Sequence, residues 1–251
     1  MQQKFAGKIA VVTGGSTGIG LAMAHRFVAE GAMVYITGRR QEQLDAAVRA
    51  VGGSIEGVAV DSANVAHLEA LFNHIKVKHG KLDVLVANAG GGSLLPLGQI
   101  TEAQFDDTFA RNVKGVLFTV QTALPLLGVG SSVILTGSTA GSGGTEAFSV
   151  YAASKAAVRS FARNWILDLK GRGIRINTLS PGPIKTPGLV GLVGDDPQQQ
   201  QGFLDQLASA IPMGRVGYPD EVAKAALFLA SEESSFVNGI ELFVDGGMRQ
   251  I

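Results

Sequence analysis

The chain has 251 residues, of which 46% are hydrophobic and 17% charged; basic and acidic residues number 21 each. This length allows one or two domains and a large core. The balanced charge favours neither nucleic acid nor an anionic membrane as a partner. The absence of cysteine excludes a disulfide framework, a thiolate nucleophile and a cysteine metal site. The apolar run near the N-terminus is too short for a signal peptide, and we expect a cytoplasmic protein without membrane partners.

The chain alternates short apolar runs with longer segments of helical periodicity. The runs are almost continuously hydrophobic, which is typical of strands that helices cover on both faces. This alternation predicts an α/β protein with a doubly wound parallel sheet and helices on both faces, in one domain over 1–251. The expected strands are 8–14, 33–38, 55–61, 82–90, 132–138, 174–182 and 240–247.

A glycine-rich turn, TGGSTGIG (13–20), directly follows the first expected strand and opens a helix. Gly14, Gly18 and Gly20 let the backbone turn sharply and approach a pyrophosphate, whose charge meets the helix N-terminus. The alternative is a tight strand-to-helix turn without a ligand. The strand–turn–helix context favours dinucleotide binding.

The end of the second expected strand indicates which dinucleotide is bound. An acidic residue there accepts the ribose 2′-hydroxyl of NAD, but this chain has TGRR, with Gly38 at the likely acidic position. A guanidinium suits a 2′-phosphate. We therefore expect Arg39 to bind the phosphate of NADP(H), whereas Arg40 is equally explained as an exposed residue that starts the next helix.

An unusual segment, TPGLVGLVGDDPQQQQGF (186–203), is rich in Gly, Pro and Gln. It follows the sixth expected strand, and ligands bind beyond the carboxyl ends of strands in such sheets. We expect a substrate lid over 186–210; a tolerated surface loop is the alternative.

Later motifs carry a family resemblance. NAG (88–90), RNVKG around Asn112, Ser138, YAASK (151–155), SPGPIKT (180–186) and VDGG (244–247) follow the glycine turn in order. With them, the whole chain resembles the single-domain short-chain dehydrogenase/reductase (SDR) family. Gly137 departs from the pattern, since many members have a second serine there. The resemblance implies a Rossmann sheet of seven strands in the order 3-2-1-4-5-6-7, and a homotetramer.

The resemblance also implies residue roles. Asn112, Ser138, Tyr151 and Lys155 would be catalytic: Ser138 would bind the substrate oxygen, and Asn112 would anchor a water that links Lys155 to solvent. Asp61 would hold the adenine and Asn88 would close over the adenosine ribose, although both could simply cap strand ends. Thr186 would bind the nicotinamide carboxamide. The implied cofactor contacts are Gly14, Ser16, Thr17, Gly18, Ile19, Gly20, Arg39, Asp61, Ser62, Asn88, Ala89, Gly90, Tyr151, Lys155, Pro181, Gly182, Ile184 and Thr186.

Tyr151 and Lys155 lie on one face if YAASK is helical. A tyrosine with a pKa near 10 exchanges protons poorly at neutral pH, and lowering that pKa by about three units needs roughly 4 kcal/mol. One positive charge about 4 Å away supplies on the order of 4 kcal/mol at an effective dielectric constant near 20. We therefore expect Lys155, helped by an oxidised nicotinamide, to make the phenol acidic.

These observations favour an NADP(H)-dependent carbonyl reductase or alcohol dehydrogenase. Loops 91–98, 139–150 and 186–203 should form the substrate walls, without an arginine and with Lys185 as the only nearby base. We expect an uncharged, fairly apolar ketone or secondary alcohol, against walls of Leu94, Leu95, Phe148, Leu189, Val190, Leu192 and Val193. The leucines could instead seal the lid against its own domain.

A 3-oxoacyl-carrier-protein reductase and, in another class, a non-catalytic NADP-binding regulator are the alternative functions. No metal cluster is expected, and exposed positions are expected for the four histidines, His25, His67, His74 and His79.

Overall fold

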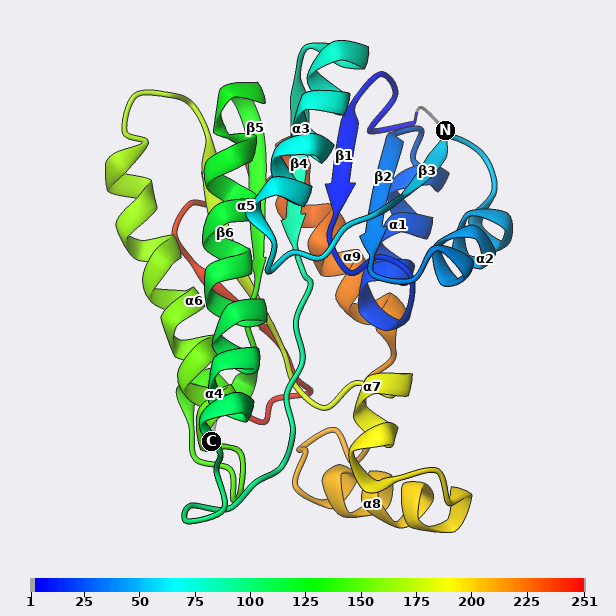
Figure 1. Ribbon diagram of the computed structural model, residues 1–251, viewed down its shortest axis with the longest axis vertical. Coiled ribbons are helices and arrows are strands. Elements are labelled where there is room, and N and C mark those ends of the chain that lie inside the picture. The colour runs from blue at the N-terminus through cyan, green and yellow to red at the C-terminus, as the bar shows by residue number, and fades with distance from the viewer. Residues whose placement is uncertain (1–2, 251) are drawn as a thin grey trace.

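The computed structural model describes residues 3–250 as a parallel seven-stranded sheet with helices on both faces (Figure 1). Its strand order, β3-β2-β1-β4-β5-β6-β7, confirms the predicted order and the α/β Rossmann fold. Residues 1–2 and 251 of the expected domain lie outside the described part. The strands are β1 (Ile9–Val12), β2 (Met33–Gly38), β3 (Ile55–Ala59), β4 (Leu82–Ala87), β5 (Leu127–Thr136), β6 (Arg175–Pro181) and β7 (Glu241–Val244).

The helices begin and end largely where capping chemistry dictates. The Asn64 side chain accepts from Ala66 N at the start of α3, and Gly80 ends that helix in a left-handed conformation. The helices are α1 (Gly18–Ala29), α2 (Gln41–Val51), α3 (Val65–His79), α4 (Glu102–Phe109), α5 (Gly115–Ala123), α6 (Ser149–Asp168), α7 (Pro187–Val190), α8 (Pro197–Ser209) and α9 (Pro219–Ala230), with short turns η1 (Ala110–Lys114), η2 (Leu124–Leu126), η3 (Thr139–Ser142), η4 (Gly191–Val193) and η5 (Glu232–Ser234).

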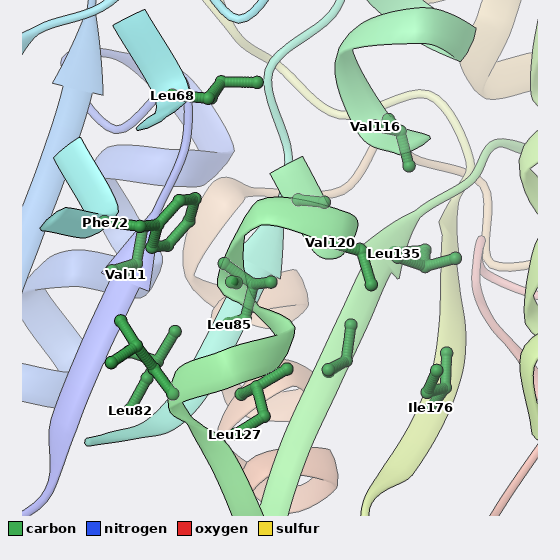
Figure 2. Packing of buried hydrophobic residues seen from close by; sticks show 14 of the residues in the cluster. Val11, Leu68, Phe72, Leu82, Leu85, Val116, Val120, Leu127, Leu135 and Ile176 are labelled. Atoms are coloured by element: carbon green, nitrogen blue, oxygen red, sulfur yellow. The ribbon is translucent and has the colours of Figure 1, made fainter. Parts of the chain in front are cut away.

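Two apolar cores lie on opposite faces of the sheet. Along β1, Ile9 and Val11 point to the core formed with α3, α5 and α6, whereas Ala10 and Val12 point to the core formed with α1, α2 and α9. Figure 2 shows the first core, where Phe72 of α3 lies beside Val11 and Val120 of α5 lies near Leu135 of β5. Because strand side chains alternate between faces, covering both faces requires the continuous apolar runs seen in the sequence.

Several strand boundaries differ from the expected ones. β1 ends at Val12 and β4 at Ala87, because the polar and glycine residues that follow turn out of the sheet. β5 begins at Leu127, earlier than expected. Its residues 128–130 are exposed and form no apolar run, so the sequence pattern does not reveal this part of the strand. The expected loop over 186–203 is mostly helical, as α7, η4 and the first part of α8.

The strand order reverses between β1 and β4, which opens a crevice beyond their carboxyl ends. In Figure 1 these ends point downwards, and α7 and α8 lie beyond them. Sequence-distant residues that follow the strands are thereby gathered at one edge of the sheet.

The expectation for the histidines is wrong for two of the four. His25 and His67 are exposed, but His74 and His79 are half-buried on α3. His79 Nε2 lies 2.8 Å from the hydroxyl of the buried Tyr35, a long-range partner that the local sequence does not reveal. Within residues 3–250 no helix is long and apolar enough to span a membrane.

Candidate active site

The glycine turn between β1 and α1 packs tightly against the end of β4. Gly14 has φ +64°, and a Cβ there would lie 2.9 Å from the Cα of Ala89. A Cβ at Gly20 would lie 2.3 Å from the carbonyl oxygen of Gly14. Thr17 precedes α1 without a side-chain cap hydrogen bond. The turn is therefore compact, and the first N–H groups of α1 remain available to an anion.

An open groove runs along the carboxyl ends of β1 to β4. Many of the predicted cofactor residues line it: Gly14, Ser16, Thr17, Arg39, Asp61, Ser62, Asn88, Ala89 and Gly90. The groove is also lined by residues that were not predicted as cofactor contacts: Thr37, Gly38, Arg40, Gln43, Val60 and Arg111. Arg111 precedes Asn112 in RNVKG, and its position on the groove depends on how η1 packs against β4, which spacing alone does not reveal.

The end of β2 is cationic. Arg39 and Arg40 are both exposed at the groove, and neither forms an ion pair within the described residues. A Cβ at Gly38 would lie 3.1 Å from Ser16 Oγ. This end of the groove therefore offers two guanidinium groups beside a position with little room for a carboxylate side chain.

Asn88 and Asp61 make structural hydrogen bonds while they line the groove. Asn88 Nδ2 donates to the carbonyls of Thr13 (2.9 Å) and Gly14 (3.2 Å). Thr13 Oγ1 accepts in turn from Asn88 N at 2.9 Å. Asp61 Oδ1 accepts from Ala63 N at 3.0 Å. Asn88 thus joins β4 to the glycine turn and Asp61 caps a turn, in line with the structural alternative considered for both.

The predicted residues after β6 divide into two groups. Thr186 lies beside the glycine turn, since a Cβ at Gly18 would lie 3.3 Å from Thr186 Cγ2. Its hydroxyl also accepts from Leu189 N at 3.1 Å and caps α7. Pro181 and Ile184 are buried, and the Ile184 side chain belongs to a hydrophobic core. Gly182 packs against Asp245, and Ile19 and Gly20 likewise pack inwards.

Tyr151 and Lys155 lie one turn apart on α6, as predicted. Lys155 is 4% exposed, and its Nζ donates to the carbonyl of Thr136 at 2.8 Å. The same Nζ lies 5.6 Å from the centroid of the Tyr151 ring. The carbonyl at the end of β5 therefore holds the ammonium on the phenol side of the helix.

Asn112 lies in η1, a π-helical turn between α4 and α5. Its Nδ2 donates to Gly91 O and to Ser154 Oγ, both at 2.9 Å, and its Oδ1 accepts from Gly91 N at 3.0 Å. A Cβ at Gly90 would lie 2.8 Å from Asn112 Oδ1 and 3.5 Å from Lys155 Nζ. The π-turn thus directs the amide toward the lysine, with both N–H groups donated and one acceptor site of Oδ1 remaining, and such turns often mark functional positions.

Ser138 follows β5 and begins the short helix η3. Its Oγ accepts from Ala140 N at 3.1 Å. Burial raises the pKa of the Tyr151 phenol, and hydrogen bonding with Ser138 lowers it by a smaller amount. The three predicted side chains Ser138, Tyr151 and Lys155 therefore form one cluster, with Asn112 next to it.

The protein groups alone do not make the phenol acidic, whereas the expected acidification also counted on an oxidised nicotinamide. Burial is the largest effect on both partners: it raises the pKa of Tyr151 and lowers the pKa of Lys155 to about 8. Both shifts have one cause, because removal from water disfavours the charged form of each group. The expectation from the sequence assigned Lys155 the full effect of a charge and left out this desolvation.

Two loops press on the tyrosine ring. Phe148 stacks on it with 4.3 Å between centroids, and a Cβ at Gly92 would lie 2.6 Å from Tyr151 Cδ2. Ala147 adopts φ +57°, and its carbonyl accepts from Leu95 N at 2.7 Å. The left-handed alanine costs on the order of 1 kcal/mol and joins the two loops beside the phenol.

The expected substrate walls are partly buried, but the charge expectation for them is wrong. Leu189, Val190, Leu192 and Val193 are half-buried on α7 and η4, and Glu146 is exposed. Lys185 is not the only base near these loops, because the Arg249 guanidinium packs on Gly143. The C-terminal turn brings Arg249 back to the site. This contact is between distant segments, and the sequence pattern does not predict it. Within residues 3–250 no cluster of three or more His, Cys, Asp or Glu is arranged to hold a metal ion.

Several known proteins resemble this chain over nearly its whole length. A family model described as enoyl-(acyl carrier protein) reductase matches residues 14–249. The chain is 47% identical to oxidoreductase asL5 of Sarocladium schorii, over 99% of this chain and 98% of that protein. It is 36% identical to an NADP-dependent (R)-specific alcohol dehydrogenase of Lentilactobacillus kefiri, over 98% of each.

The solved structures include a levodione reductase of the same fold. It superposes with a TM-score of 0.92 at 30% identity, covering 97% of this chain and 98% of that chain. The fold, the ordered motifs and these matches lead to one conclusion: the chain belongs to the short-chain dehydrogenase/reductase family of oxidoreductases.

Proposed function

We propose that the protein transfers a hydride between NADP(H) and an uncharged ketone or its secondary alcohol. The observation that carries this proposal is the half-buried Tyr151 paired with the buried Lys155, with Ser138 beside them, close to a groove that suits a dinucleotide. A protein that only binds the dinucleotide has no need for an ammonium buried next to a phenol, since burying that charge costs stability.

The groove fits a dinucleotide in shape and in donors. Gly14 and Gly18 present no side chain to a pyrophosphate, and the uncapped start of α1 offers N–H groups to it. Thr37 Oγ1 is buried on the groove wall without a hydrogen-bond partner in the described part of the chain, so it is available to a bound ligand. Asp61 and Ser62 would hold the adenosine, and Lys155 would hold the ribose next to the nicotinamide.

The cationic end of β2 supports NADP(H) over NAD(H). Arg39 offers a bidentate donor to a 2′-phosphate, while Gly38 provides no carboxylate for a 2′-hydroxyl. The relative from Lentilactobacillus kefiri is named as NADP-dependent. We extend this preference to the present chain.

When bound, NADP(H) supplies the hydride that reaches the carbonyl carbon. Ser138 donates a hydrogen bond to the carbonyl oxygen as negative charge develops on it. Tyr151 transfers its phenolic proton to that oxygen, and alcohol oxidation reverses both steps. Because burial raises the pKa of Tyr151, the phenol is protonated at neutral pH, which suits it to reduction. Lys155 offsets the phenolate charge, and Asn112 holds a water that returns the proton from solvent.

The substrate class follows from the walls. Leu94, Leu95 and Phe148 on one side and the apolar residues of α7 and η4 on the other offer hydrocarbon surface. We propose that α7 and α8 act as the lid of a single domain, because they lie beyond the carboxyl ends of the strands (Figure 1). An uncharged ketone buries well between such surfaces. A cytoplasmic homotetramer completes the proposal, on the family resemblance.

A 3-oxoacyl thioester is the second candidate substrate, because a 3-oxoacyl-[acyl-carrier-protein] reductase of Thermotoga maritima is 34% identical to the chain over 98% of its length. Reduction of such a thioester uses the same catalytic groups. The two candidates differ in whether a carrier protein must dock near the site.

Replacing Tyr151 by Phe should lower kcat at least 100-fold, in the range usual for loss of a general acid. The Kd of NADPH should stay nearly unchanged, because the ring and its stacking partner remain. Steady-state rates and fluorescence titration measure the two quantities, with the exposed Tyr218→Phe as control. A Tyr151→Phe enzyme that keeps more than about a hundredth of the wild-type rate would contradict the assignment.

Replacing Arg39 by Ala should weaken NADPH binding roughly 10- to 150-fold, since a charge-assisted hydrogen bond contributes about 1.5–3 kcal/mol. NADH binding should hardly change, because it has no 2′-phosphate. Calorimetric titration of both cofactors measures this difference, and the exposed Arg49→Ala on α2 is a charge-matched control. An equal loss for both cofactors would show that Arg39 is structural.

Replacing Lys155 by Met should raise the free energy of unfolding at pH 7 by about 1–3 kcal/mol while abolishing turnover. In the folded protein the pKa of Lys155 is about 8, below the ordinary lysine value of 10.5. Below pH 8 the buried ammonium therefore lowers the free energy of unfolding by its full amount. That cost fades as pH rises toward 10.5. Urea unfolding at pH 7 and pH 10 should show the advantage of the variant shrinking, with Lys170→Met as control. A variant less stable than the wild type at both pH values would show that the buried ammonium is not a net cost to folding.

Aryl and alkyl ketones should give higher kcat/KM with NADPH than 2-oxo acids or free sugars, since the walls are apolar. Initial rates over a panel that includes free and carrier-bound 3-oxoacyl thioesters measure the preference. A carrier-bound thioester that exceeds every ketone would select the second candidate. A complete lack of turnover with NADPH or NADH would favour a non-catalytic, regulatory binding protein.

A further inference from the structure

After β7 the chain makes a tight turn that carries Arg249 back to the active site. Asp245, which is 8% exposed, accepts from Gly247 N and from Arg249 N, both at 2.9 Å. Met213 N, just beyond α8, donates to Gly246 O at 3.2 Å. The turn is thereby fixed from its interior and from the lid side, and Arg249 leaves it in a defined direction.

The Arg249 side chain lies on the loop between the two catalytic residues Ser138 and Tyr151. Its Nε donates to the carbonyl of Thr139 at 3.0 Å. A Cβ at Gly143 would lie 2.0 Å from Nη1 of the guanidinium, so only glycine leaves room for it there. Arg249 thus holds the short helix η3 at both ends: its Nε donates to the first residue of η3, and its guanidinium plane packs on the glycine that follows the last residue.

Thr139 directly follows Ser138, and the same short helix orients the serine. Ser138 Oγ accepts from Ala140 N at 3.1 Å, and Ser138 O accepts from Gly141 N at 2.9 Å. The Thr139 carbonyl that Arg249 holds also accepts from Ser142 Oγ at 3.2 Å. Any movement of η3 therefore moves the donor that sets the Ser138 hydroxyl.

We propose that Arg249 is a positioning residue, which fixes η3 and thereby aims the Ser138 hydroxyl at the substrate oxygen. This inference rests on the proposed catalytic role of Ser138. The contacts of Arg249 are with the backbone of this segment: its Nε is committed to Thr139 and its plane to Gly143. The C-terminal turn thus acts on the chemistry through one backbone carbonyl.

Replacing Arg249 by Ala should lower kcat for a ketone roughly 5- to 50-fold, in the range of coupling between residues in contact. The KM for NADPH should change less than about twofold, because the cofactor groove is formed by other segments. The melting temperature should fall by about 2–4 °C at most, as expected for one hydrogen bond in a chain of this size. Arg249→Lys keeps the charge without the planar fork and should recover only part of kcat, and Arg49→Ala is the charge control.

A double-mutant cycle with Ser138→Ala distinguishes positioning from general support. Once the Ser138 hydroxyl is gone, Arg249→Ala should cost less than about twofold more in kcat. An equal cost in both backgrounds, or a rise in KM confined to anionic substrates, would overturn the proposal. If Ser138→Ala alone has no effect on kcat, the proposed function fails; if only Arg249→Ala has none, the proposed function stands and this inference fails.

Discussion

The ammonium of Lys155 donates to the carbonyl at the end of β5, and water reaches little of the side chain. A cation in such a place is expensive, because protein dipoles replace its hydration only in part. The apolar face of α6, with Val158 and Ala162, packs into the core and sets the orientation of the helix, and the carbonyl of Thr136 holds the end of the lysine side chain. The same orientation directs Tyr151 toward the loop that follows β5. The position of the ammonium beside the phenol thus depends on this hydrogen bond between a helix and a strand end.

Removal from water affects the two ionisable partners in opposite directions. The phenol keeps its proton more tightly, and the ammonium releases its proton more easily. In a dry site the proton affinity of each group also responds strongly to charge arriving nearby, because little water screens that charge. Gly92 and Phe148 maintain this dryness by covering the ring, at the cost of a left-handed alanine.

The sequence was sufficient to predict features with a local or periodic cause. Continuous apolar runs predicted the strands, and the glycine turn predicted the groove beside Gly14. The spacing within YAASK predicted that Tyr151 and Lys155 share a helix face. Each of these depends on residues that lie close together in the chain.

The remaining features depend on contacts between distant segments or on burial. Arg249 contacts Gly143 although the two residues lie far apart in the sequence. The helices α7 and α8 were not predicted, because the segment after Thr186 is rich in Gly, Pro and Gln. The π-turn at Asn112 has no distinct sequence signal, because its stability comes from Gly91 and Ser154. The direction of the Tyr151 pKa shift required knowledge of how much water the fold excludes.

The reversal of strand order between β1 and β4 divides the molecule by task. Residues that line the dinucleotide groove follow β1, β2, β3 and β4, whereas the groups assigned to proton transfer and substrate walls come mainly after β5, β6 and β7. A substitution near Arg39 thus lies at the end of a different half of the sheet from one near Phe148 or α7. Cofactor preference and substrate preference can therefore change in separate evolutionary steps. Such modularity allows one architecture to diversify through substitutions in one half at a time.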